Sequence, residues 1–125
     1  MGTRILVVED QPNSREIYTL LLKLEGYEVV RAKNGRAGYK KAEEENPDLI
    51  FTDLSMPKMS GDKMIRRLRA KKKFKKLPIV AITAHGPQSP EARAALEAGA
   101  DRVIDKTDDL DILLDVIRQL VSQSA

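Results

Sequence analysis

The chain contains no cysteine and only one histidine, His85. Without cysteine it can form neither a disulfide framework nor a thiolate zinc site, and a single histidine cannot make a zinc site by itself. No apolar run approaches the roughly 20 residues needed to cross a bilayer. An apolar run begins almost at the N-terminus, so we expect no signal peptide. These absences favour a reducing compartment, and we expect a cytoplasmic protein.

Basic residues are concentrated in one part of the chain. The 125 residues predict a single domain, residues 1–125, with a net charge of +3. Residues 66–76 hold eight basic residues and no acidic one, so the rest of the chain is mildly acidic. This weakens any inference of nucleic-acid binding from charge alone. We interpret the segment as a solvated helix end, with docking to an acidic partner or to nucleic acid as the alternative.

Short apolar runs alternate with helical patterns along the chain. The predicted strands are residues 4–8, 28–32, 49–52, 79–83 and 102–104. The first helical pattern rests on Ile17, Leu20, Leu21 and Leu24, and Gly26 is its stop signal. Later helices are expected over residues 35–45, after residues 60–61, up to Gly99, and from residue 110, with a frayed tail from residue 122. Strict alternation implies parallel strands joined by right-handed crossovers, with the polar second strand at an edge.

Acidic residues follow two of the predicted central strands. Glu9 and Asp10 come directly after one apolar run, and Asp53 comes directly after another. The carboxyl ends of parallel strands form the ligand crevice of an open α/β sheet, so these carboxylates are expected to converge. Converging carboxylates repel one another unless a cation lies among them, and Mg²⁺ prefers oxygen ligands. The sequence therefore predicts a metal site with a potential aspartyl nucleophile.

Five motifs lie in a consistent order along this alternating pattern. They are Val8-Glu9-Asp10, Asp53-x-x-Met56-Pro57-x-Met59-x-Gly61, Thr83-Ala84, Gly99-Ala100-Asp101 and Asp105-Lys106. With them the chain resembles the receiver domain of bacterial two-component response regulators, in particular the single-domain, chemotaxis-regulator-like members. The resemblance implies a doubly wound, flavodoxin-like α/β fold. Its five-stranded parallel sheet would have the order 2-1-3-4-5, with about five helices.

The resemblance implies a role for each carboxylate. Asp53 would be the phosphoacceptor, which takes a phosphoryl group from a histidine kinase or a phosphotransfer protein. Asp10 and Asp53 would ligate Mg²⁺, and Glu9 would assist through a water or a longer contact. The backbone carbonyl of Ser55 would be a further metal ligand. Such chemistry suits a carboxylate, because phosphoryl transfer depends on positioning and on neutralising charge.

Residues from later strand ends complete the implied site. Lys106 would pair with Asp53 and later with the phosphoryl oxygens, where a compact point charge is suitable. Thr83 would move to hydrogen-bond the phosphoryl group. The positions of Ser55 and His85 would tune the hydrolysis of the acyl phosphate, although an exposed loop histidine is an equally good interpretation of His85.

The implied function is a signalling switch that alters partner binding or relays a phosphoryl group, and we expect no turnover of a separate substrate. Its partners would be a histidine kinase or phosphotransfer protein and a downstream protein target. We expect no direct nucleic-acid contact, since no helix-turn-helix pattern is present, and no membrane insertion. A monomer or a weak, phosphorylation-dependent dimer is expected.

Two other functions remain as alternatives. A small Mg²⁺-dependent phosphatase with an aspartyl nucleophile usually has an Asp-x-Asp pair after its first strand, which Glu9-Asp10-Gln11-Pro12 does not supply. A nucleotide or flavin binder needs a phosphate cradle. The turn at residues 9–14 has no glycine, and its acidic residues would repel phosphate.

Two positions depart from the pattern of the family. Thr107 stands where a proline usually follows the lysine, and Val103 stands where a switch aromatic is usual. We therefore expect phosphorylation without the usual threonine–aromatic coupling. The signal would leave instead through the loop at residues 84–89 and the start of the following helix.

Overall fold

Five short strands form one parallel sheet in the computed structural model, which describes residues 2–56 and 58–124. The strands are β1 (Arg4–Val8), β2 (Glu28–Ala32), β3 (Leu49–Asp53), β4 (Ile79–Thr83) and β5 (Arg102–Asp105). They lie in the order β2-β1-β3-β4-β5, so the predicted fold, strand order and edge position of β2 are confirmed. Two strands run one residue further than predicted, and β3 therefore includes Asp53 itself.

Helices join the strands, with a short 3-10 helix, η1 (Lys72–Phe74), before β4. They are α1 (Pro12–Leu24), α2 (Gly35–Glu45), α3 (Gly61–Arg69), α4 (Pro90–Ala98) and α5 (Leu110–Ser124). The side chain of Ser89 caps α4 by accepting a 3.1 Å hydrogen bond from the backbone N–H of Ala92. Gly99 ends α4 with φ 118°, a left-handed conformation that favours glycine. Helix α5 continues to Ser124, so the predicted frayed tail is wrong over residues 122–124.

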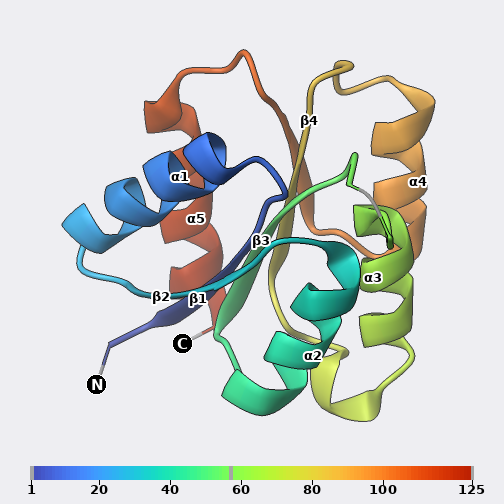
Figure 1. Cartoon of the computed structure of the whole chain (residues 1–125), viewed down its shortest axis with the longest axis horizontal. Coiled ribbons are helices and arrows are strands. Elements are labelled where there is room, and N and C mark those ends of the chain that lie inside the picture. The colour runs from blue at the N-terminus through green and yellow to red at the C-terminus, as the bar shows by residue number, and fades with distance from the viewer. Residues whose placement is uncertain (1, 57, 125) are drawn as a thin grey trace.

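Side-chain alternation divides the core into two layers. Successive residues of a strand point to opposite faces of the sheet. Ile5, Val7 and Phe51 pack under α1 and α5, whereas Leu6 and Val8 pack under α2, α3 and α4. Figure 1 shows these two groups of helices on opposite sides of the sheet. Every residue of β3 and β4 is buried, as expected for central strands that are covered on both faces.

Helix α1 buries a different face from the one that its apolar spacing marked. Ile17, Leu20 and Leu24 are 56%, 58% and 77% exposed, and Leu21, the fourth residue of the pattern, is half-buried against the core layer under α1 and α5. The buried face is formed by Tyr18 and Leu22, and the Tyr18 ring meets Phe51 edge-on with 4.8 Å between centroids. The apolar period thus predicted the helix, but packing against the sheet decided which side faces inward.

None of the helices described over residues 2–56 and 58–124 has the length and apolarity that a membrane crossing requires.

Replacement of Gly38 by alanine is expected to destabilise the fold. Alanine is better than glycine by about 1 kcal/mol in an exposed helix interior. At Gly38, however, an added Cβ would lie 2.7 Å from Met64 Sδ and 2.9 Å from Val8 Cγ2. We expect Gly38→Ala to lower the free energy of unfolding by about 1–3 kcal/mol through overpacking. Denaturant titration measures this.

Lys40→Ala, at an exposed position of the same helix, is the matched control and should change stability by less than about 0.5 kcal/mol. A Gly38→Ala protein as stable as the wild type would show that α2 can move away from β1 and α3 at little cost.

Candidate functional site

The register of the sheet brings the predicted acidic residues together. Strands β1 and β3 pair so that Val8 lies opposite Thr52. Glu9 and Asp53 each follow by one residue, at the carboxyl edge of the sheet. One carboxylate oxygen from each of Glu9, Asp10 and Asp53 lies within 4.8 Å of the other two. The predicted convergence of carboxylates from two strand ends is therefore confirmed.

Two of the three carboxylates are almost fully buried. Glu9 is 1% exposed and Asp53 is 4% exposed. Burial, with a smaller contribution from the negative charge of Asp53, raises the pKa of Glu9 to about 7. The hydrogen bond from the Gln11 N–H and the ammonium of Lys106 lower this pKa, but by less. Burial also raises the pKa of Asp53, and the ammonium of Lys106 opposes that rise. Both carboxylates are thus held in a place that disfavours their charge unless a cation is near.

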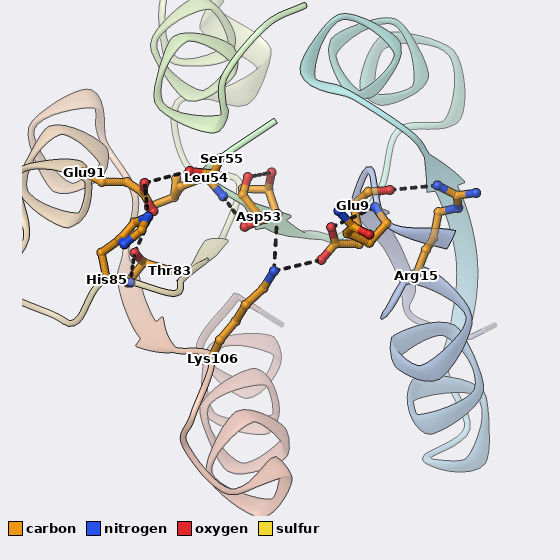
Figure 2. Close-up of polar contacts among 11 residues, drawn as sticks. Glu9, Arg15, Asp53, Leu54, Ser55, Thr83, His85, Glu91 and Lys106 are labelled. Carbon is orange, nitrogen blue, oxygen red and sulfur yellow. Dashed lines mark hydrogen bonds and ion pairs between the residues drawn. The ribbon is translucent and has the colours of Figure 1, made fainter. Parts of the chain in front are cut away.

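Lys106 supplies one such cation. Its Nζ lies 3.5 Å from Asp53 Oδ2 and 3.7 Å from Glu9 Oε1, and Figure 2 shows the ammonium reaching between the two carboxylates. The backbone positions the lysine, because its N–H donates a 2.7 Å hydrogen bond to the carbonyl of Thr83. The predicted pairing of Lys106 with Asp53 is present.

Oxygen atoms in the cluster still have capacity for a metal ion. The buried Glu9 Oε1 has no hydrogen-bond partner among the described residues, and its contact with Lys106 is beyond hydrogen-bond range. Glu9 Oε2 accepts from the backbone N–H of Gln11 at 3.1 Å, and Asp53 Oδ1 accepts from the N–H of Leu54 at 2.9 Å. A hard divalent cation takes oxygen ligands of this kind. Glu9, Asp10 and Asp53 therefore form an acidic pocket that fits Mg²⁺.

Thr83 and Ser55 are close to the cluster but are engaged elsewhere. The Thr83 hydroxyl donates to Glu91 Oε1 at 2.6 Å, and the Ser55 hydroxyl donates to Glu91 Oε2 at 2.8 Å (Figure 2). His85 Nε2 lies 3.7 Å from Glu91 Oε2, so the histidine belongs to this group of contacts. Sequence reasoning missed Glu91, since it lies eight residues from one partner and 36 from the other.

The glycine of the longest motif has a clear steric role. A Cβ at Gly61 would lie 2.5 Å from the backbone oxygen of Asp53, so α3 can begin against the end of β3 only without a side chain there. Met56 and Met59 pack against the core cluster under α2, α3 and α4. Pro57, which belongs to the same motif, lies outside the described residues.

The two atypical positions have ordinary structural surroundings. Val103 is half-buried and packs against the core layer that includes α3 and α4. The N–H and the hydroxyl of Thr107 donate to Asp105 Oδ1 at 2.9 and 2.8 Å. These two bonds lower the pKa of Asp105. A proline in place of Thr107 would supply neither donor.

Asp101, from another motif, has a structural role at the opposite edge of the sheet, where β4 begins. Its Oδ2 accepts from the backbone N–H of Ile79 at 2.8 Å and from Arg69 Nη2 at 3.1 Å. Arg69 also donates to the carbonyl of Gly99. The Gly99-Ala100-Asp101 motif thus fixes the start of β4 rather than contributing to the acidic pocket.

Comparison with known proteins agrees with this architecture. Residues 5–118 match the response regulator receiver domain family. The DNA-binding dual master transcriptional regulator RpaA of Synechocystis is 31% identical over 121 residues, which cover 97% of this chain and 50% of RpaA. A 14.6 kDa protein of Leptolyngbya boryana is 34% identical over 115 residues, 92% of this chain and 87% of that protein. The chain spans half or less of the length of several other curated relatives.

A solved structure with a similar fold contains a metal ion. The receiver domain of a sensor histidine kinase from Pseudomonas aeruginosa, which has a magnesium ion coordinated in its active site cleft, superposes with a TM-score of 0.90 at 26% identity. The match covers 98% of this chain and 99% of that one. With a family match that spans nearly its whole length, this chain belongs to the response regulator receiver domains of two-component signal transduction.

Proposed function

We propose that the chain is a phosphorylatable signalling switch in which Asp53 accepts a phosphoryl group from a histidine kinase or a phosphotransfer protein. The observation that supports this most is the buried Asp53 carboxylate, which ends a central strand inside an acidic pocket with Lys106 3.5 Å away. An aspartate that served only to cap a turn would need neither the carboxylates of Glu9 and Asp10 nor the ammonium of Lys106 beside it. Residues 1–125 would form this one receiver domain.

The chain's own groups can position the transfer. An Asp53 oxygen would attack phosphorus while the bond from phosphorus to the donor histidine nitrogen breaks, and the electron pair of that bond would go to nitrogen. The N–H of Leu54 fixes Oδ1 at 2.9 Å, whereas Oδ2 lies toward Lys106. Because charge develops on the phosphoryl oxygens, the lysine would be in place to offset it.

The metal site would share these residues. Asp10 and Asp53 would hold Mg²⁺ through their carboxylates, Glu9 would assist, and Ser55 would contribute its backbone carbonyl. When bound, Mg²⁺ neutralises negative charge on carboxylates and on phosphoryl oxygens. The similar kinase receiver with magnesium in its cleft supports this assignment. The aspartyl phosphate would then change the binding of a downstream protein or be passed onward.

Asp53→Asn should abolish phosphorylation, because the amide is a poor nucleophile. The test is incubation with acetyl phosphate and Mg²⁺, followed by intact-mass measurement for a single added phosphoryl group. Asp111→Asn, at an exposed aspartate of α5, is the control and should label as the wild type does. Labelling of Asp53→Asn, or peptide mapping that puts the group on another residue, would contradict the proposal. Continuous release of phosphate would favour the phosphatase alternative.

Lys106→Ala should slow phosphorylation more than it lowers stability. Removing a positioned cation from developing charge is expected to reduce the labelling rate by at least about tenfold. The neighbouring carboxylates can respond by binding a proton, which limits the loss of stability. Labelling kinetics and denaturation are measured together, with Lys76→Ala at an exposed site as the control. A wild-type labelling rate in Lys106→Ala would remove the lysine from the mechanism.

Mg²⁺ should bind more weakly as the pH falls. Glu9 has a pKa of about 7, above its ordinary value, so it takes up a proton as the pH drops through neutrality and then competes with the metal. Between about pH 8 and about pH 6 the apparent affinity should fall by about tenfold. Amide NMR titration with Mg²⁺ measures this. Glu9→Gln should bind more weakly with a flatter pH profile, and an equally steep profile in that variant would exclude Glu9 as the source.

A further inference from the structure

Glu91 connects two segments that border the acidic pocket. Its Oε1 accepts from the hydroxyl of Thr83, which ends β4, and its Oε2 accepts from the hydroxyl of Ser55, which follows β3 (Figure 2). Each carboxylate oxygen therefore serves one hydroxyl. Glu91 itself lies in the first turn of α4, so its side chain ties that helix to both strand ends.

The pleat of the sheet explains why Thr83 meets Glu91 and not Asp53. Ala81 packs in the core layer under α4, and Thr83 follows it by two residues on the same face of β4. Phe51 packs in the layer under α1 and α5, and Asp53 follows it by two residues on that opposite face. The Thr83 side chain thus begins on the side of the sheet where α4 supplies an acceptor.

A hydroxyl has a single hydrogen to donate. The hydrogen of Thr83 goes to Glu91 at 2.6 Å, and the same oxygen accepts the backbone N–H of His85 at 3.1 Å. A hydrogen bond to a carboxylate is charge-assisted and roughly twice as strong as a neutral one. An oxygen of a phosphoryl group on Asp53 would also accept this hydrogen, so the phosphoryl group and Glu91 would compete for it.

We propose that Glu91 is a positioning residue that holds the Thr83 hydroxyl away from Asp53 until Asp53 is phosphorylated. Donation from Thr83 to the phosphoryl group then breaks the bond to Glu91 and releases the first turn of α4. The inference rests on the proposed phosphorylation of Asp53. It adds to the proposed function the residue that sets the resting position of the switch and joins it to α4.

The surroundings of Glu91 allow such a release. An open cleft of about 600 Å³ lies beside it, and its lining includes Ser55, Asp62 and Glu91 itself. The freed carboxylate can move into this cleft, where solvent reaches it. The Ser55 hydroxyl donates to the other oxygen of the same carboxylate. A movement of Glu91 therefore also affects the segment after β3, which couples this segment to the start of α4.

A simpler role for Glu91 must be separated from this one. An acidic residue in the first turn of a helix is stabilising because of the helix dipole, and Glu91 occupies such a place. That role needs the charge but not the length of the side chain. Glu91→Asp keeps the charge and shortens the reach by one methylene, so it weakens both hydroxyl contacts while leaving the dipole interaction.

The test measures the affinity of the whole chain for beryllofluoride with Mg²⁺ present, by amide NMR. Beryllofluoride stands in for the phosphoryl group on Asp53. We expect Glu91→Ala to bind about tenfold more tightly than the wild type, equivalent to about 1.4 kcal/mol, and Glu91→Asp to shift in the same direction. The amide signal of Thr83 in free Glu91→Ala should move toward its position in the wild-type complex. Glu97→Ala, at an exposed site of α4, should bind as the wild type does.

A second background makes the test specific to the hydroxyl. In Thr83→Val, which has no hydrogen to release, adding Glu91→Ala should leave beryllofluoride affinity unchanged. Equal or weaker binding by Glu91→Ala, a wild-type affinity in Glu91→Asp, or a gain that persists in Thr83→Val would overturn the inference alone. A wild-type chain that neither binds beryllofluoride nor labels with acetyl phosphate would overturn the proposed function itself.

Discussion

The burial of Glu9 and Asp53 side by side is the constraint on which the functional edge of this domain depends. An ionised carboxylate loses several kcal/mol of solvation on burial, and a second carboxylate nearby adds repulsion. Parallel pairing of β1 and β3 places both groups at adjacent strand ends. Lys106 offsets the repulsion only in part, because one ammonium is shared between them at 3.5 and 3.7 Å. The pocket therefore carries excess negative charge, which favours the binding of a cation.

Such an unfavourable pocket persists because the backbone around it is fixed. Arg15 donates to the carbonyl of Glu9 at 2.9 Å, and this bond holds the chain where β1 turns into α1. Gly61 lets α3 start directly against β3, and its N–H donates to the carbonyl of Leu54 at 3.0 Å. These contacts restrain the backbone at the carboxyl ends of β1 and β3, so the Glu9 and Asp53 carboxylates begin from neighbouring positions despite their repulsion.

The alternating strands and helices and the acidic pocket could be predicted from the sequence because both follow from local patterns, whereas the strand order was predicted from the resemblance to receiver domains. Apolar runs identified the strands, and a polar residue directly after a buried strand is expected at the sheet edge, which located Asp53. Lys106 was predicted from the resemblance to receiver domains. Other features depend on packing between distant segments. The inward face of α1 is chosen by the fit of Tyr18 against Phe51, and no spacing of Ile17, Leu20 and Leu24 reveals it.

Glu91 lies at the limit of such reasoning. In the sequence it is a helix-start acid after Ser89 and Pro90, a place where glutamate is common for reasons of the helix dipole alone. Its contacts with Thr83 and Ser55 arise only when α4 packs beside the ends of β3 and β4. A contact made by tertiary placement, between residues 36 apart, has no signature in a single sequence.

The absence of an aromatic side chain at position 103 is the reason to expect a different route for the signal out of the site. Val103 is β-branched, half-buried in the layer with α3 and α4, and too short to turn between an inward and an outward position. A switch still requires an element with two discrete arrangements. The single hydrogen of the Thr83 hydroxyl meets that requirement, since it can be given either to Glu91 or to a phosphoryl oxygen but not to both. If Asp53 is phosphorylated as proposed, the choice of acceptor would be the step at which the charge on Asp53 is converted into a change at α4.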